Sequence, residues 1–226
     1  MKTSKLAFLY CCLLFSSGYR LVAQTAFSCD HVNKKDIVPK NTRQLLVVDY
    51  AIAGYKIYPC QKDKGIWMSG LPSSVVSIGK KGIIAAQNKM EGDLKTPAGL
   101  YLLGTAFGTT DLRLRFPYRK LTIDDKFVDD INSKQYNRWV RGKTDAASYE
   151  PMLKYYRYGI VINYNMDPVI PGKGSAIFIH NWSILEEPTS GCIAMAESNL
   201  ITILRWLNKK SNPMVLILPA TNSNNF

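Results

Sequence analysis

The chain has 226 residues, of which 46% are hydrophobic and 20% charged, and its formal net charge is +12. This length and apolar content suit one folded domain with short extensions and exclude a wholly disordered chain. A basic balance favours anionic partners, but no helix-turn-helix, zinc-finger or RNA-binding signature accompanies it, so no nucleic-acid partner is expected. No apolar stretch of membrane-spanning length follows the N-terminus, so no transmembrane helix is expected in the mature chain.

Residues 1–23 have the pattern of a secretory signal peptide. Lys2 and Lys5 supply the positive end, residues 6–15 form an apolar run too short to span a bilayer comfortably, and Ala23 offers small-residue cleavage. An uncleaved anchor is the alternative. We therefore expect export to the periplasm or the cell wall. Removal of the signal, with its three cations and no acid, leaves a net charge of about +9.

Three cysteines follow this signal: Cys29, Cys60 and Cys192. An odd number in an oxidising compartment suggests one disulfide and one free thiol. The economical pairing joins Cys29 to Cys60, ties the N-terminal extension to the domain and leaves Cys192 free. The alternative is that all three are reduced, because the geometry that a disulfide needs cannot be read from sequence.

Short apolar runs bounded by turn residues predict several β-strands in the first half of the chain. Residues 24–43 are polar and mixed, and they are interpreted as an extended lead-in to a domain over 44–219, which a polar tail over 220–226 follows. Within the domain, strands are predicted over 44–50, 55–58, 75–78, 82–86 and 100–103. The segment 89–99 between the last two is predicted to be a loop with chemistry-capable groups, or else an ordinary solvated turn.

Residues 107–139 mix aromatic, basic and acidic side chains without clear periodicity. A run of this length inside a compact domain often forms a functional loop or lid, and its composition suits a peptide-and-sugar substrate. An ordinary solvated loop fits equally well. Asp129 and Asp130 have the chemistry of metal ligands, but no other ligand set converges on them, so no metal site is expected.

The last third of the chain predicts more short strands and the clearest helix. Strands are expected over 158–163, 175–179 and 214–218, and residues 149–156 suit a short helix or an irregular turn. Over 197–208, four apolar residues recur on one helical face: Leu200, Ile203, Leu204 and Leu207. The predicted fold class is therefore mainly β, a mixed sheet curled into a sandwich or partial barrel, with one clear helix after Cys192.

A histidine and a cysteine stand twelve positions apart in the stretch 174–195. His180 ends an apolar run predicted as a strand, and Cys192 follows a Pro-Thr-Ser-Gly turn and precedes the helical pattern. The other histidine of the chain, His31, lies far upstream. His180 is therefore nearly the sole candidate for chemistry that needs an imidazole base.

This pairing has a chemical purpose, because the reactive form of a cysteine is its thiolate. The imidazole of His180 can take the thiol proton of Cys192, and a helix N-terminus can stabilise the anion. Gly191 leaves room for a substrate carbonyl, and the amides of Gly191 and Cys192 are candidates for an oxyanion hole. The alternative is a buried structural cysteine beside a satisfied histidine.

Three blocks of sequence together resemble the catalytic domain of the L,D-transpeptidase (YkuD-type) family. The first has Gly-Ser-Ala-Ile-Phe-Ile-His over 174–180 and Pro-Thr-Ser-Gly-Cys-Ile-Ala over 188–194. The second extends from Gly-Lys-Lys-Gly at its start to Glu-Gly-Asp-Leu-Lys-Thr-Pro-Ala-Gly at its end, over 79–99, and the third covers 128–137. The resemblance extends over about 44–218, and it implies the YkuD-type architecture.

The signature departs from the commonest form of the family at several positions. Thr189 and Ser190 stand where many members have Ser-His, Asn181 replaces a glycine, and Ala194 replaces an arginine. The Pro-Thr-x-Gly-Cys-x-Ala form occurs in one branch, so the changes do not indicate inactivation. We expect Thr189, Ser190, Asn181 and Asp93 on the substrate side of the site, with Asp93 as a support residue and not a catalyst.

The resemblance implies acyl transfer on peptidoglycan stem peptides without a cofactor. Cys192 would attack the carbonyl between the L-centre of the third residue and the following D-residue, with His180 as base and then acid. An amine from a second stem would resolve the thioester as an L,D-transpeptidase does. Water would make the protein an L,D-carboxypeptidase or another wall-peptide hydrolase. A non-catalytic wall-binding protein is the third alternative, and the oligomeric state is not indicated.

Overall fold

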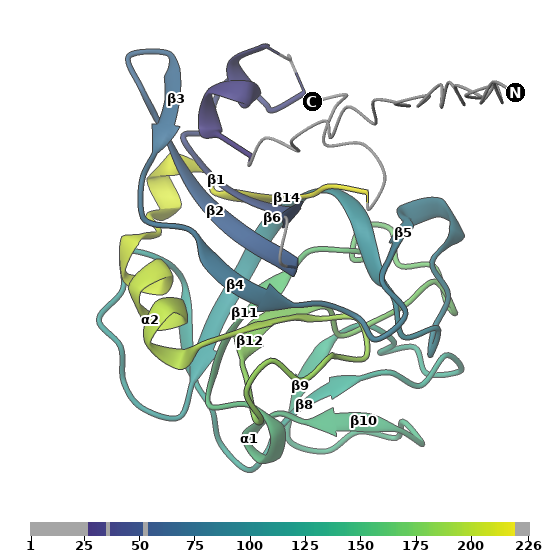
Figure 1. Cartoon of the computed structure of the whole chain (residues 1–226). Helices are drawn as coiled ribbons and strands as arrows, with labels where there is room; N and C mark the ends of the chain where they lie inside the picture. Colours follow the sequence, from purple (N-terminus) through teal and green to yellow (C-terminus); the bar gives the residue numbers. More distant parts are fainter. Residues whose placement is uncertain (1–26, 35–36, 52–53, 220–226) are drawn as a thin grey trace, which may run out of the picture.

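The computed structural model describes residues 27–34, 37–51 and 54–219 (Figure 1). The predicted signal peptide over 1–23 and the predicted tail over 220–226 lie outside these described residues. Among the residues described, none of the helices combines the length and the apolar character needed to cross a lipid bilayer.

The described elements follow one another along the chain, with η marking 3-10 helices. Their order is η1 (Cys29–Lys34), β1 (Gln44–Ala51), β2 (Gly54–Asp63), β3 (Ile66–Ser69), β4 (Ser74–Ser77), β5 (Ile83–Ala85), η2 (Ala86–Asn88), β6 (Thr96–Gly108), β7 (Tyr118–Lys120), β8 (Asp125–Val128), β9 (Trp139–Arg141), β10 (Tyr149–Pro151), α1 (Met152–Tyr155), β11 (Tyr158–Ile162), β12 (Phe178–Asn181), β13 (Ile193–Met195), α2 (Glu197–Trp206), η3 (Lys209–Ser211) and β14 (Met214–Ile217).

The main sheet closes on itself (Figure 1). Its strands follow the order β1-β14-β6-β11-β12-β13-β4-β2, and β1 pairs with β2 to complete the ring. The pairs β1–β14 and β12–β13 are parallel, whereas the other neighbours in the ring are antiparallel. This closed, barrel-like mixed sheet with its helix after Cys192 confirms the predicted mainly β class.

The apolar run of β1 is buried on both faces because a separate cluster lies on each side of the strand. Leu46 and Val48 join the main core, which also holds the apolar face of α2. Leu45 and Val47 join a second cluster that includes the N-terminal segment. Side chains alternate between the faces of a strand, so a continuous apolar run indicates burial on both.

The N-terminal segment is folded onto this second cluster, so the prediction of an extended lead-in over 24–43 is wrong for its described part. Residues Cys29–Lys34 form η1, and Phe27 and Val32 are buried beside Trp67 of β3. A disulfide joins Cys29 to Cys60 of β2, as the economical pairing predicts, and leaves Cys192 with a free thiol. The apolar residues among the polar ones were too sparse to show a pattern.

The predicted apolar face of the helix is buried, because Leu200, Ile203, Leu204 and Leu207 all belong to the main core. The helix α2 ends at Trp206, two residues earlier than predicted, and Leu207 is its C-terminal cap in an extended conformation. Leu207 is nevertheless fully buried. The helical spacing of apolar residues therefore predicted the burial of Leu207 correctly, although the helical backbone ends one residue earlier.

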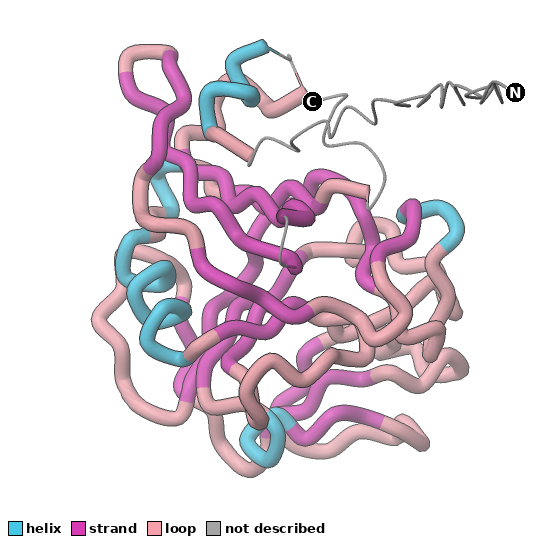
Figure 2. The backbone as a smooth tube through the Cα atoms, viewed as in Figure 1, coloured by secondary structure: helices cyan, strands magenta, loops and turns pink. Residues whose placement is uncertain are grey.

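Residues 107–139 are better ordered than the sequence indicated. The whole of β7 and β8 and the start of β9 lie in this region. The strand β8 pairs with β9 and β10 in a small separate sheet, which Figure 1 and Figure 2 show beside the closed one. Asp125 anchors it, because its carboxylate accepts hydrogen bonds from Trp139 and Arg141. A strand this short, paired outside the main core, leaves no clear alternation in the sequence.

The other strand predictions place the elements correctly but not their ends. The strand β6 covers Thr96–Gly108, far beyond the predicted 100–103, and β3 was not predicted. The strand β12 begins at Phe178 and includes His180, whereas the prediction began at 175. The apolar run over 100–103 marks only the middle of β6, because proline, glycine and threonine residues interrupt the apolar pattern on either side of it.

Candidate active site

His180 lies on β12, and Cys192 directly precedes β13, the parallel neighbour of β12 in the closed sheet. The register pairs Ile179 with Ile193 and His180 with Ala194, so Cys192 stands two residues before the partner of His180. Alternation sends Ile179 and Ile193 into the main core. His180, Cys192 and Ala194 therefore share the opposite face, where all three line one cleft.

This cleft has a volume of about 270 Å³. Part of its lining comes from β10, α1 and the residue after α1, and part from the loop between β12 and β13, which Figure 1 shows close to α1. Thr189 and Ser190 are among the lining residues. Gly191, Asn181 and Asp93 are not. The full lining is Glu150, Tyr155, Tyr156, His180, Trp182, Ser183, Ile184, Glu187, Pro188, Thr189, Ser190, Cys192 and Ala194.

The thiol of Cys192 is 8% exposed and held by two backbone groups. The amide of Phe178 donates to Sγ at 3.3 Å, and Sγ donates to the carbonyl of Ala176 at 3.2 Å. Burial raises the pKa of the Cys192 thiol, and the charge of Glu150 adds to this, although the Phe178 amide and Lys89 act in the opposite direction. The raised pKa favours the thiol form of Cys192, which would have to lose its proton before the sulfur could act as a nucleophile.

The predicted helix N-terminus does not lie at Cys192, and that part of the sequence interpretation is wrong. The strand β13, Ile193–Met195, separates Cys192 from α2, which begins at Glu197. A three-residue strand that leads directly into an amphipathic helix cannot be distinguished from the helix by its apolar pattern. The groups that contact Sγ are the backbone amide and carbonyl of the neighbouring segment, not a helix end.

The imidazole of His180 is oriented by a backbone carbonyl. Nδ1 lies 2.8 Å from the carbonyl oxygen of Asn181, which can only accept a hydrogen bond, so Nδ1 carries the proton and Nε2 is the basic nitrogen. The ring of Tyr156 packs edge-on against the imidazole at a centroid distance of 5.0 Å. Burial lowers the pKa of His180 despite the Asn181 hydrogen bond, which favours a neutral base.

Asn181 serves the site through its backbone. Its side chain is 4% exposed, and its Oδ1 accepts from the amides of Arg157 and Tyr158 at 3.2 and 2.9 Å. Its Nδ2 donates to the carbonyl of Trp182. The side-chain amide of Asn181, which the sequence placed on the substrate side, therefore links β12 to the start of β11. The atom of Asn181 that contacts His180 is the backbone carbonyl oxygen.

Gly191 and Thr189 shape the turn before Cys192. Thr189 Oγ1 donates to the Cys192 carbonyl at 2.6 Å and accepts from the Gly191 amide at 3.1 Å. Gly191 has a φ of +143°, and a Cβ there would lie 3.0 Å from the carbonyl oxygen of Lys95. The space that glycine provides thus serves this backbone contact. The amide of Gly191 donates a hydrogen bond to Thr189 within the turn. Of the two amides expected to donate to an oxyanion, the Cys192 amide therefore remains as the candidate.

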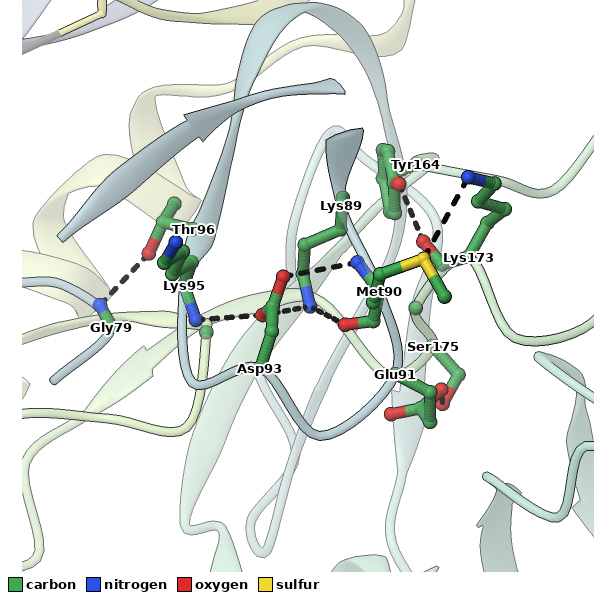
Figure 3. Close-up of polar contacts among 12 residues, drawn as sticks. Gly79, Lys89, Met90, Glu91, Asp93, Lys95, Thr96, Tyr164, Lys173 and Ser175 are labelled. Atoms are coloured by element: carbon green, nitrogen blue, oxygen red, sulfur yellow. Dashed lines mark hydrogen bonds and ion pairs between the residues drawn. The ribbon is translucent and has the colours of Figure 1, made fainter. Parts of the chain in front are cut away.

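Residues 89–96, hereafter the support loop, contact the backbone of Cys192 through Thr96, and Figure 3 shows the polar contacts within this loop. The hydroxyl of Thr96 accepts from the amide of Gly79 at 2.8 Å and donates to the carbonyl of Cys192 at 3.4 Å. Thr96 is fully buried. The two threonines, Thr96 and Thr189, therefore fix one carbonyl from two separate segments of the chain.

Asp93 organises the support loop from within, as Figure 3 shows. Its carboxylate accepts from Lys89 Nζ at 2.7 Å, from the Met90 amide at 3.0 Å and from the Lys95 amide at 2.9 Å. Burial alone would raise the pKa of Asp93, but these hydrogen bonds outweigh burial and lower it. These contacts lie within the support loop, and Asp93 is not among the residues that line the cleft.

The L,D-transpeptidase catalytic domain model (YkuD) matches residues 43–217. The chain belongs to this family. Two solved structures of the helical cell shape determining protein Pgp2 from Campylobacter jejuni, one of them a variant, are similar to it at 16% and 20% identity, with TM-scores of 0.48 and 0.44. They cover 85% and 82% of the chain, which spans about half of their length (53% and 54%). A search of curated protein sequences found no match.

Within this L,D-transpeptidase domain, Ala194 occupies the position where many family members have an arginine. It pairs with His180 in the β12–β13 register, lines the cleft and is 1% exposed. A methyl group therefore stands beside the imidazole at a place that would otherwise carry a cation.

The sequence interpretation missed Glu150, Tyr156 and Trp182, which line the cleft beside Cys192 and His180. Tyr156 donates a hydrogen bond to Glu150, and Trp182 Nε1 donates to Ser77 Oγ at 2.9 Å. The signal that could have found the first two is an acid and three tyrosines within 149–156, a segment that the sequence assigned only a conformation.

Asp129 and Asp130 have different environments. Asp130 accepts from the amides of Asn132 and Ala147, at 2.9 and 2.8 Å, and stabilises a turn. Asp129 Oδ1 is buried and has no hydrogen-bond partner among the residues that the structure describes. None of the residues that line the cleft comes from 107–139, so this region does not cover the cleft as a lid would.

Proposed function

We propose that this protein is an exported cysteine acyltransferase that acts on peptidoglycan stem peptides as an L,D-transpeptidase. The observation that carries the proposal is the placement of His180 on β12 and of Cys192 directly before the adjacent parallel strand β13, so that both line one cleft. Membership of the family supports the reaction class. Export rests on the signal pattern of residues 1–23.

The acylation step uses the two side chains in sequence. His180 Nε2 takes the thiol proton while Sγ of Cys192 attacks the carbonyl between the L-centre of the third stem residue and the D-residue that follows. The C–N bond then breaks, the imidazolium gives its proton to the leaving amine, and a thioester remains on Cys192. The Cys192 amide is the candidate donor to the oxyanion.

The neutral resting pair suits this sequence. Because burial raises the pKa of Cys192 and lowers that of His180, proton transfer is coupled to attack and the idle enzyme carries no thiolate. An uncharged thiol is a poor target for oxidants and stray electrophiles. The Phe178 amide stabilises the thiolate that forms during attack and leaves again when the thioester is resolved.

A second candidate is an L,D-carboxypeptidase, in which water resolves the thioester. The observation that favours it is Ala194, because the arginine that many family members place beside the histidine is absent from this face of the sheet. Both reactions share the acylation step and need no cofactor, so they differ only in the acceptor.

The test incubates purified disaccharide-tetrapeptide with the mature protein and with Cys192→Ala, and analyses the products by mass spectrometry. We expect a Cys192-dependent dimer that has lost one terminal D-alanine. A Cys192-dependent tripeptide without dimer would replace the transpeptidase with the carboxypeptidase. The absence of both products from the wild-type reaction would overturn the acyl-transfer proposal and favour a non-catalytic wall-binding protein.

A further inference from the structure

The cleft contains a carboxyl group that the acylation step does not use. Glu150 lies in the middle of β10, paired in register with Phe127 of β8, and it lines the cleft with Cys192 and His180. The hydroxyl of Tyr156 donates a hydrogen bond to Glu150 Oε2, and the same Tyr156 ring packs against the imidazole. Carboxyl, phenol and imidazole therefore form one continuous edge of the cleft, hereafter the acidic wall.

The acidic wall works against thiolate formation. The charge of Glu150 raises the pKa of Cys192, and burial together with the charges of Asp129 and Glu91 raises the pKa of Glu150 to about 7, while the Tyr156 hydrogen bond opposes the rise. Asp129 Oδ1 adds a buried oxygen without a partner among the described residues. A site that needed only a thiolate would gain nothing from this carboxyl, whereas a cationic ligand would be stabilised by it.

Resolution of the thioester by an amine presents such a cation. A primary amine is an ammonium ion at neutral pH and is not a nucleophile until it loses a proton. When this nitrogen attacks, it must lose a second proton, and His180 is the base for that one, because it is neutral once the leaving amine has taken its proton. The first proton requires another acceptor in the cleft.

We propose that Glu150, held by Tyr156, binds the ammonium group of the acceptor stem and takes its first proton. This inference rests on the proposed function and names its acceptor as a primary amine. The carboxylate becomes a carboxylic acid, and the free amine attacks the thioester carbonyl. The new C–N bond forms, the C–S bond breaks, the second proton passes to His180, and Cys192 recovers its proton from the imidazolium. Glu150 returns its proton to solvent.

The titration range of Glu150 suits this role. With a pKa of about 7, the group is present as carboxylate and as acid in similar amounts at neutral pH, so it can accept a proton and release it again. Tyr156 cannot substitute as the base, because burial and the neighbouring Cys192 and Glu150 charges raise its pKa well above the usual range. Its hydroxyl remains a donor that orients the carboxyl.

The experiment compares wild type, Glu150→Gln and Glu186→Gln on two substrates. One is the disaccharide-tetrapeptide with a free side-chain amine, and the other is the same compound with that amine acetylated, which leaves water as the acceptor. Glu186 is the matched control, because it is exposed and lies outside the cleft lining. Circular dichroism checks that the variants are folded, and Tyr156→Phe provides a second change to the acidic wall that retains the carboxyl.

For Glu150→Gln we expect dimer formation to fall roughly 100-fold, within the range for loss of a general base, while hydrolysis of the acetylated substrate stays within about threefold of wild type. The wild-type dimer rate should rise with pH through about 7, and this rise should disappear in the variant. Tyr156→Phe should move this rise in the dimer rate to a higher pH, because the Tyr156 hydrogen bond lowers the pKa of Glu150. Glu186→Gln should match wild type on both substrates.

Three results would overturn the inference while the proposed function stands: an unchanged dimer rate in Glu150→Gln, an equal loss with both substrates, or an unchanged pH profile. Wild-type protein that yields only tripeptide from the free-amine substrate would also overturn it, with acyl transfer to water established. If wild type forms neither product from either substrate, the proposed function itself fails, and the assignment of Glu150 fails with it.

Discussion

The support loop and the acidic wall, which flank Cys192, differ in how their charged groups are satisfied. In the support loop, Asp93 accepts hydrogen bonds from Lys89 and from two backbone amides. In the acidic wall, the hydrogen bond to Glu150 comes from Tyr156, and outside the wall Asp129, whose charge acts on Glu150, has an Oδ1 without a partner among the described residues. The first arrangement lowers a carboxyl pKa and the second raises one. Saturated polar groups hold a backbone in place, whereas an undersatisfied carboxyl retains the capacity to bind and to titrate.

The largest effect on the rate is expected at His180, the imidazole of the acidic wall. His180→Gln retains a similar shape but removes the base, so acylation of Cys192 by the stem peptide should slow roughly 10²–10⁴-fold. The measurement is the rate of Cys192-dependent product formation. Unfolding by urea should show little change in stability. A loss of stability that matches the loss of rate would mean that His180 serves the fold and not the chemistry.

Substitutions in the support loop should have the opposite effect and lower the stability of the protein. Asp93→Asn leaves the buried Lys89 ammonium without its counter-ion, and breaking such a pair typically costs about 3–5 kcal/mol. Urea unfolding measures the change. Asp111→Asn is the matched control, because its ion pair with Lys120 is exposed, and such pairs contribute roughly 0–1 kcal/mol. Equal effects at the two positions would contradict a structural role for the buried pair.

A smaller loss of stability is expected when Thr96, which joins the support loop to Cys192, is replaced. Thr96→Val removes the hydroxyl that contacts Gly79 and Cys192, and leaving buried backbone groups unsatisfied costs about 1–3 kcal/mol. Thr202→Val on the exposed face of α2 is the control, with an expected change within about 0.5 kcal/mol. Urea denaturation midpoints of the two variants measure the difference. If Thr96→Val leaves the stability unchanged, the support loop must hold Cys192 by other contacts.

The pH dependence of stability should separate the two kinds of carboxyl. Because the folded-state pKa of Glu150 is raised from 4.5 to about 7, its contribution is present at low pH and lost as the pH rises between these values. Glu150→Gln should flatten that decline in urea midpoints. A decline that persists in the variant would show that another group titrates in this range.

The pKa of Asp125 is shifted in the opposite direction to that of Glu150. Burial by itself would raise its pKa, but hydrogen bonds from Arg141, Thr122 and Trp139 lower it from 3.8 to about 2. Its contribution is therefore present above about pH 4 and lost as the pH falls toward 2. Asp125→Asn should remove this acid-induced loss in the same urea series. An unchanged acid limb would mean that other carboxyls carry it.

The sequence by itself determined what local chemistry and periodicity can encode. The spacing of Leu200, Ile203 and Leu204 placed the face of α2, because a helix repeats its contacts every 3.6 residues. The blocks around His180 and Cys192, together with the two blocks upstream, indicated the family that the match over residues 43–217 shows. The odd cysteine count favoured the Cys29–Cys60 pair that the structure contains.

Only the tertiary structure decided which groups meet at the cleft. Glu150 lies about 40 residues from Cys192 in the chain, and its place beside the nucleophile depends on the small sheet that β10 joins. The strand β13, which removes Cys192 from the helix end, has too few residues to show a period of two. Side-chain burial, and with it the pKa of Glu150 and of Cys192, arises from contacts between distant segments, which no local pattern records.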